Sequence, residues 1–173
     1  MRSIIAGALV VGLLAGTAAA EIESRSQSGF VVAYEADLAI PPQDAYAKWL
    51  QIGGWWSPVH TYSGDSKNLS ITPDPGGCWC EALKDGGFVV HLRVVSAQPG
   101  KALLFSGGLG PLAYMGVAGS MVVEFKATAT GTHVTLRYAV GGYDPSNFAA
   151  LPAAVDGVLG EGFQRYAAFA AQP

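Results

Sequence analysis

The stretch FAALPAAVDGVLGEGFQRYAAF, Phe148–Phe169, decides the fold class. Its apolar residues recur at intervals of three and four, which predicts one face of a long helix. They are Phe148, Leu151, Val155, Val158, Leu159, Gly162, Phe163, Tyr166 and Phe169. The segments before this stretch follow a different period, so the helix ends a chain that otherwise consists mainly of strands.

Alternation of apolar and other residues predicts a first strand over residues 30–40, after a polar lead-in over residues 21–28. Pro41 and Pro42 end that strand, and two short helical segments follow. Residues 69–140 then show strand and turn patterns, with a hairpin signal at Asp85-Gly86. The order of strand, helical pair, about six antiparallel strands and long helix predicts an α+β fold.

The first twenty residues have the pattern of a secretory signal peptide. Arg2 precedes a short apolar core, and residues 18–20 are Ala-Ala-Ala, which suits a cleavage site. This apolar run is too short to span a membrane, and no later segment is long enough either. We therefore expect cleavage near Ala20, a secreted or periplasmic protein, and a single domain over residues 21–173.

The charge pattern limits the classes of partner. Charged residues make up 13% of the chain, the formal net charge is −3, and the Lys and Arg residues are scattered singly. A nucleic-acid or anionic-lipid surface requires clustered basic residues, so neither partner is expected. Apolar residues make up 50% of the chain, which predicts a packed core. The oligomeric state is left open.

Cys78 and Cys80 are separated by one residue, and His91 follows eleven residues after the second. A two-residue loop at Asp85-Gly86 pairs Cys80 with His91 and puts all three side chains on the outer face of the hairpin. Two thiolates and an imidazole are suitable ligands for Zn or Cu, and simple packing of small residues is the alternative. A disulfide is not expected, because residues i and i+2 of a flat strand lie too far apart.

Glu81 falls on the opposite, inner face of the same hairpin. That face otherwise carries the apolar residues Trp79, Leu83, Phe88, Val90, Leu92 and Val94. Burial there would raise the pKa of the Glu81 carboxyl and suit it to general acid–base catalysis. The alternative is a paired or hydrated carboxylate near the rim of the sheet. No nucleophile elbow, zinc-protease motif or phosphate loop is present in the sequence.

Several segments together resemble a known superfamily. They are Trp49, Trp55-Trp56, Gly76-Gly77, Val94, Gln98–Leu103 and the final helix. Their order is similar to that of the START-like, birch-pollen-allergen-like superfamily, also called SRPBCC. The branch labelled polyketide cyclase or heat-shock-ATPase-activator-like is the most similar, here in an exported subgroup that carries Cys-Trp-Cys-Glu.

The resemblance implies a helix-grip fold. In this fold a curved antiparallel sheet of about six to seven strands wraps around the C-terminal helix, with two short helices after strand 1. An apolar cavity lies between sheet and helix, and Gly107–Leu112 is a candidate lid. The candidate ligand-binding residues are Trp49, Trp55, Trp56, Trp79, Glu81, Val90, Phe105, Leu109, Tyr138, Val155, Leu159 and Phe163.

The expected function is binding of a small hydrophobic molecule by a periplasmic START-like protein. One alternative is an enzyme of cyclase, isomerase or hydrolase type with Glu81 as its general acid or base, so whether the protein is catalytic is left open. Another is a soft-metal or redox module at Cys78, Cys80 and His91. No cofactor is expected under the first hypothesis, whereas the last requires Zn, Cu or reduced thiols.

Overall fold

A computed structural model describes residues 19–146 and 148–172, with the backbone alone for residues 19–21. Residues 1–18, which form most of the predicted signal peptide, lie outside the described residues. The predicted cleavage site falls inside the first strand, β1, which spans Ala19–Ser26. Within the described residues, no helix combines the length and the apolar character needed to cross a bilayer.

The fold is α+β, as predicted: one antiparallel sheet is packed against a long C-terminal helix. The sheet has eight strands in the order β1-β2-β8-β7-β6-β5-β4-β3. After β1 the strands are β2 (Gly29–Leu38), β3 (Leu69–Ile71), β4 (Cys78–Ala82), β5 (Phe88–Gln98), β6 (Ala102–Ser106), β7 (Gly116–Ala127) and β8 (Thr132–Tyr143). The additional strand is β1, because the polar lead-in pairs with β2 along its whole length.

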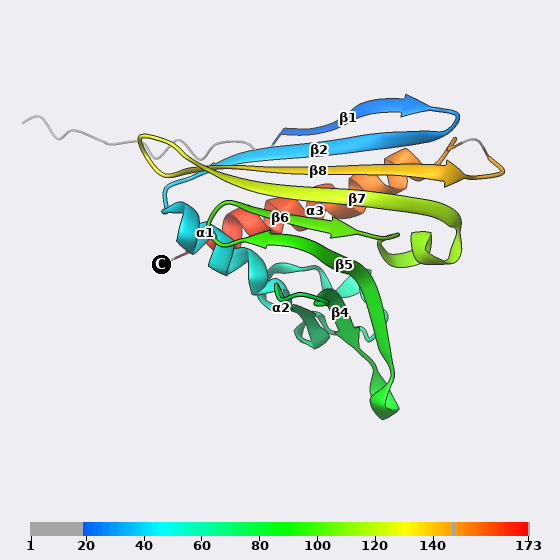
Figure 1. Ribbon diagram of the computed structural model, residues 1–173, viewed down its shortest axis with the longest axis horizontal. Coiled ribbons are helices and arrows are strands. Elements are labelled where there is room, and N and C mark those ends of the chain that lie inside the picture. The colour runs from blue at the N-terminus through cyan, green and yellow to red at the C-terminus, as the bar shows by residue number, and fades with distance from the viewer. Residues whose placement is uncertain (1–18, 147, 173) are drawn as a thin grey trace, which may run out of the picture.

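Short helical segments connect the strands. They are α1 (Pro42–Leu50), α2 (Ile52–Trp55), and the 3-10 turns η1 (Pro58–His60), η2 (Ser66–Asn68), η3 (Lys84–Gly86) and η4 (Gly110–Tyr114). The predicted pair of short helices after the first long strand is therefore α1 and α2. In Figure 1 the β4–β5 hairpin projects from the main body of the sheet.

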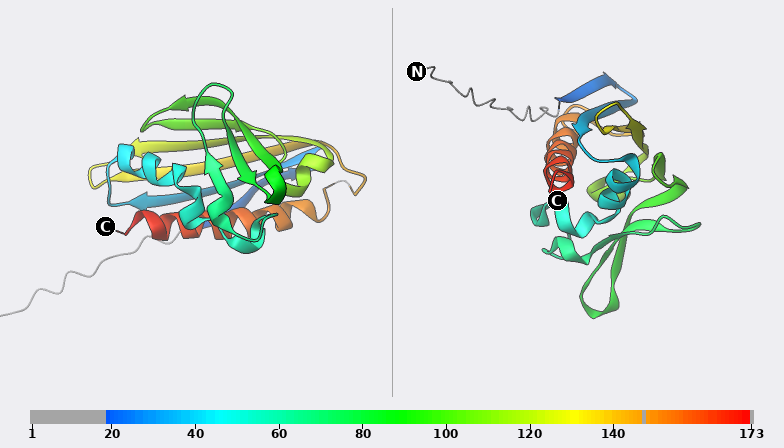
Figure 2. Two further views of the ribbon diagram at one scale, coloured as in Figure 1. Left: turned by 90° about the horizontal axis from the view of Figure 1, so that it is seen from below. Right: turned by 90° about the vertical axis from the view of Figure 1, so that its left-hand side faces the viewer.

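The helix α3, Leu151–Ala170, lies across one face of the sheet, and Figure 2 shows it from below and end-on. Its Pro152 stands in the first turn, where proline is tolerated. The core fills the space between α3, α1, α2 and the inner face of the sheet. Five aromatic side chains of this core are almost fully buried and pack edge to face or at a tilt: Trp49, Trp55, Trp79, Phe163 and Tyr166.

The β4–β5 hairpin departs from the predicted register. Asp85 and Gly86 both have positive φ, as predicted for a tight turn. The predicted two-residue loop is wrong, however, because residues 83–87 connect the strands and Ala82 pairs with Phe88. The pairs next to the turn are therefore offset by one residue, with Cys80 opposite Val90, and a bulge then restores the predicted pairing of Trp79 with Leu92. The residue left over on β5 is His91. Such an extra residue redirects side chains locally, and both His91 and its neighbour Leu92 are buried.

Candidate functional site

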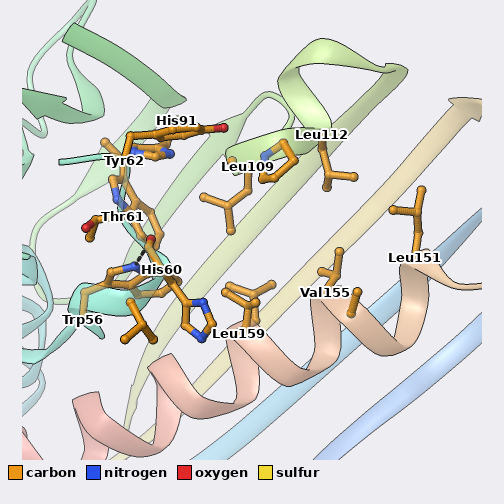
Figure 3. A pocket seen from close by; sticks show the side chains of 16 residues that line it. Trp56, His60, Thr61, Tyr62, His91, Leu109, Leu112, Leu151, Val155 and Leu159 are labelled. Carbon is orange, nitrogen blue, oxygen red and sulfur yellow. Dashed lines mark hydrogen bonds between the residues drawn. The ribbon is translucent and has the colours of Figure 1, made fainter. Parts of the chain in front are cut away.

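A cavity of about 430 Å³ lies between α3, the loop after α2, the loop before β7 and the inner face of β4 and β5 (Figure 3). This volume is within the range of small-molecule pockets. The lining residues are Trp56, Val59, His60, Thr61, Tyr62, Trp79, His91, Leu109, Gly110, Pro111, Leu112, Leu151, Ala154, Val155, Val158 and Leu159. Most of these side chains are apolar.

One wall of the cavity is the apolar face of α3. Leu151, Val155 and Leu159 follow one another at intervals of four, which places them on one side of a helix. Figure 3 shows these three side chains pointing from α3 toward Leu109 and Leu112 on the opposite wall. The apolar helix face predicted from the sequence therefore lines part of the cavity and also contributes to the core.

Two indoles close one end. The rings of Trp56 and Trp79 meet edge to face, with centroids 4.9 Å apart and an interplanar angle of 89°. The Trp56 Nε1 donates to the carbonyl of His60 at 2.9 Å, drawn as a dashed line in Figure 3, and this bond fixes the loop that follows. The His60 Nε2 in turn lies 3.0 Å from Glu161 on α3. The contact between His60 and Glu161 thus ties the loop after α2 to α3.

A buried carboxylate lies behind this end of the cavity. Glu81 has no solvent-exposed surface, and its Oε2 lies 2.9 Å from Nε2 of His91. Its carboxylate also accepts the backbone N–H groups of Tyr62 and Ser63. Burial raises the pKa of Glu81, but the hydrogen bonds from Ser63, His91 and Tyr62 lower it more, so the net pKa lies below the ordinary value.

The prediction of a raised Glu81 pKa is therefore wrong. The burial predicted from the alternation of β4 is confirmed. The pairing given as the alternative is also found, with the backbone of Tyr62 and Ser63 and with His91 as partners, but the carboxylate is not hydrated. Glu81 also does not line the cavity, whereas His91 does. If proton transfer occurs at this site, the group that can reach a ligand is the imidazole, and Glu81 can act only through it.

The placement of His91 on the outer face with the cysteines is also wrong. The bulge opposite Trp79 turns its side chain inward, away from Cys78 and Cys80. Among residues 19–146 and 148–172, no cluster of three His, Cys, Asp or Glu side chains could hold a metal ion. The structure thus does not assemble the Zn or Cu site proposed from Cys78, Cys80 and His91. The same shift of register carries Val90 to the outer face, opposite Cys80.

Cys78 and Cys80 form a disulfide, which corrects the expectation that they would not. That expectation assumed a flat strand, on which two residues span roughly 6.6 Å. Here the two Cα atoms are 5.3 Å apart, within the range that a disulfide requires. The bulge begins next to Cys80, and bulges bend and twist a strand locally.

The predicted ligand-binding residues separate into two groups. Trp56, Trp79, Leu109, Val155 and Leu159 line the cavity. The others do not line the cavity. Six of these are buried: Trp49, Trp55, Glu81, Phe105, Tyr138 and Phe163. The remaining one, Val90, lies opposite Cys80 on the hairpin. Whether the lining residues bind a ligand remains a prediction.

The sequence pattern missed His91 as an inner-face residue. A signal for it was nevertheless present, because a carboxylate on an apolar face requires a partner. The neighbouring strand offers one imidazole within reach of Glu81, and that imidazole is His91.

No family model matches this chain, and no curated protein matches it. Solved structures do match. A putative uncharacterized protein from Rhizobium leguminosarum gives a TM-score of 0.59 at 18% identity, over 90% of this chain and 98% of that chain. Protein MLL2253 from Mesorhizobium loti gives a TM-score of 0.58 at 15% identity, over 80% of this chain and 95% of that chain.

A third similar structure is the di-domain ARO/CYC StfQ from the steffimycin biosynthetic pathway. It gives a TM-score of 0.54 at 15% identity, over 84% of this chain and 50% of that chain. Identities this low carry information about the fold alone. Together with the curved eight-stranded sheet and the C-terminal helix, the similarities show a helix-grip fold.

Proposed function

We propose that this protein binds a small hydrophobic molecule in the cavity between α3 and the sheet, as an exported member of the SRPBCC superfamily. The observation that carries the proposal is the cavity itself: about 430 Å³, with mainly apolar walls and few polar groups. Pockets of this kind bind ligands through apolar contact and use their few polar groups for orientation. The similarity in fold to polyketide cyclase ARO/CYC proteins supports binding of a small hydrophobic molecule.

A substitution that fills the cavity tests the proposal. Val155 is half-buried and lines the cavity from α3, so Val155→Trp places an indole inside it. Ala153→Trp is the matched control, because Ala153 is exposed on the same helix and does not line the cavity. A neutral fluorescent probe such as N-phenyl-1-naphthylamine is titrated into each folded variant.

The expected result is that Val155→Trp lowers probe affinity by about tenfold or more, while Ala153→Trp keeps the wild-type affinity. Circular dichroism and thermal unfolding establish that both variants are folded. Equal probe affinity in wild type and Val155→Trp would overturn the proposal, because the probe would then bind elsewhere.

A proton-transfer enzyme is the second candidate, and the position of His91 favours it. In the sequence-based version of this hypothesis Glu81 was the acid or base, whereas the cavity is reached by the imidazole that Glu81 orients. Exchange of the α-hydrogens of 2-tetralone in D2O, followed by NMR, tests it. A rate above the buffer rate that is lost in His91→Phe would support catalysis, and a rate equal to buffer would oppose it.

A further inference from the structure

The hydrogen-bonding role of one His91 nitrogen is fixed by Glu81. The Glu81 carboxylate is fully buried and has a pKa below its ordinary value, so it is ionised at neutral pH. An ionised carboxylate can only accept hydrogen bonds. Since Nε2 of His91 lies 2.9 Å from its Oε2, Nε2 must carry the hydrogen. Whenever the ring is neutral, this contact holds it in one tautomer.

The other ring nitrogen, Nδ1, then carries a lone pair and is an acceptor. Within the described part of the chain, Nδ1 of His91 has no hydrogen-bond partner. His91 is only 6% exposed and lines the cavity, whereas Glu81 does not, so the ring edge away from Glu81 faces the cavity. Nδ1 is not one of the fully buried unpaired side-chain atoms of the described residues, so it is accessible from the cavity. A ligand donor that replaces water at this acceptor would form its hydrogen bond among apolar walls, where such a bond is stronger than in water.

Neighbouring aromatic rings hold the imidazole in this orientation. The Tyr62 ring stacks on it with centroids 5.9 Å apart and an interplanar angle of 26°, and Trp79 lies at a tilt 6.4 Å away. Figure 3 shows Tyr62 and His91 together at one end of the cavity. The ring is therefore positioned before any ligand enters, which reduces the entropy lost on binding.

Other polar groups along the cavity are already occupied. Trp56 Nε1 donates to the His60 carbonyl, His60 Nε2 pairs with Glu161, and Thr61 Oγ1 donates to the Pro58 carbonyl. Nδ1 of His91 is the polar atom that lies deepest among these groups, because His91 is buried, whereas Tyr62 and His60, which also line the cavity, are partly exposed. A ligand group that bonds to Nδ1 must be a donor.

The geometry points to a hydrophobic ligand of the phenol class, whose hydroxyl donates to Nδ1 of His91 while its rings fill the apolar part of the cavity. This inference rests on the proposed binding function and adds the chemistry of the ligand. A phenol combines a strong O–H donor with a flat apolar body, which suits the indoles of Trp56 and Trp79. A ligand with only acceptor oxygens would face the lone pair of Nδ1 and be disfavoured.

The test compares 2-naphthol with its methyl ether, 2-methoxynaphthalene. The two probes have the same ring system, but only the first has a hydroxyl donor. Both are titrated by calorimetry into the wild-type protein at pH 8, where imidazole groups are ordinarily neutral. We expect 2-naphthol to bind about tenfold more tightly than the ether, the usual contribution of one well-placed buried hydrogen bond.

The Glu81→Gln/His91→Phe double variant removes the acceptor and leaves no charged side chain at position 81. The ratio of its affinities for 2-naphthol and for the ether should fall from about ten to about one. An independent readout uses wild-type protein labelled with 15N. The Nδ1 resonance of His91 should shift on addition of 2-naphthol and stay unchanged with the ether.

The outcomes separate the two proposals. Equal affinity of wild type for both probes, with no shift of the Nδ1 resonance, would overturn the phenol inference and leave the hydrophobic binding function standing. Absence of binding by either probe, together with absence of binding by N-phenyl-1-naphthylamine, would overturn both. The NMR measurement needs no variant, so misfolding of the double variant does not remove the test.

Discussion

Tyr138 holds the loop at Leu109 in place. Its hydroxyl, on β8, accepts the Leu109 N–H at 3.0 Å and donates to the Gly107 carbonyl at 2.9 Å. Burial raises the pKa of Tyr138 to about 12, so this hydroxyl stays protonated and can make both bonds. Leu109 lines the cavity and Tyr138 does not. A core side chain thus determines the position of a cavity wall.

Removal of this hydroxyl should loosen that wall. In Tyr138→Phe the buried groups of Gly107 and Leu109 lose their partner, which should lower the free energy of unfolding by about 1–3 kcal/mol. Hydrogen exchange at the Leu109 amide should become faster, and by a larger factor than the loss of global stability alone would produce. Tyr143→Phe is the control, because Tyr143 is on the same strand and 74% exposed. Equal exchange in the two variants would show that the hydroxyl does not hold the loop.

A second close approach places Trp56 against α3. A Cβ added at Gly162 would come within 2.5 Å of Cζ3 of the Trp56 ring, so the indole packs where only glycine leaves room. Gly162→Ala should therefore displace Trp56, lower the free energy of unfolding by about 1–3 kcal/mol and weaken probe binding.

Gly157→Ala is the matched control for that substitution. Gly157 is exposed on the same helix, and an added Cβ there would meet nothing within 4 Å. Chemical denaturation should show a gain of about 0.4–1 kcal/mol for Gly157→Ala, because alanine restricts the unfolded chain. A stabilising effect of both substitutions would contradict the close packing of Trp56.

Local periodicity was sufficient to predict most of the fold. The α3 helix has an apolar face with the helical period, and Asp85 takes the positive φ that its turn motif predicted. The β1 strand was missed for a physical reason. It lies at the edge of the sheet and its described side chains are exposed, so no apolar alternation marks it.

The site was harder to predict, because a change of one residue in the pairing of β4 with β5 decides which side chains face the cavity. A shift by one residue transfers every later side chain to the opposite face of a strand. The loop of residues 83–87, longer than predicted, does this for Cys80 and Glu81 and their partners on β5, and the bulge at His91 restores the predicted pairing of Cys78 with Arg93. Single-sequence patterns contain no clear mark of a bulge. The inward His91, the outward Val90 and the disulfide were therefore all missed.

The disulfide should have little influence on the cavity. Cys78 and Cys80 lie on the face of β4 opposite Trp79, and the bond closes a loop with a single intervening residue. Loop closure over so short a segment contributes less than about 2 kcal/mol. The Cys78→Ser/Cys80→Ser variant should keep wild-type probe affinity, with a small loss of stability in urea. Thiol titration of unfolded wild type without reductant should detect no free thiol, and two free thiols would contradict the disulfide.

Acid should destabilise the protein in part through Glu81. A carboxyl group whose pKa is lower in the folded state contributes stability that is complete above its ordinary value of 4.5 and is lost as the pH falls through the folded pKa. The free energy of unfolding should thus decrease below about pH 5, and Glu81→Gln should make this decrease less steep.

Glu161→Gln is the control. Hydrogen bonds from Ser57 and His60 also lower the pKa of the Glu161 carboxyl, but this side chain is 41% exposed, so solvent weakens the effect on stability. Urea unfolding at several pH values measures the slopes. A wild-type slope in Glu81→Gln and also in the Glu81→Gln/His91→Phe variant, in which no imidazole can compensate, would mean that titration of Glu81 contributes little to acid unfolding.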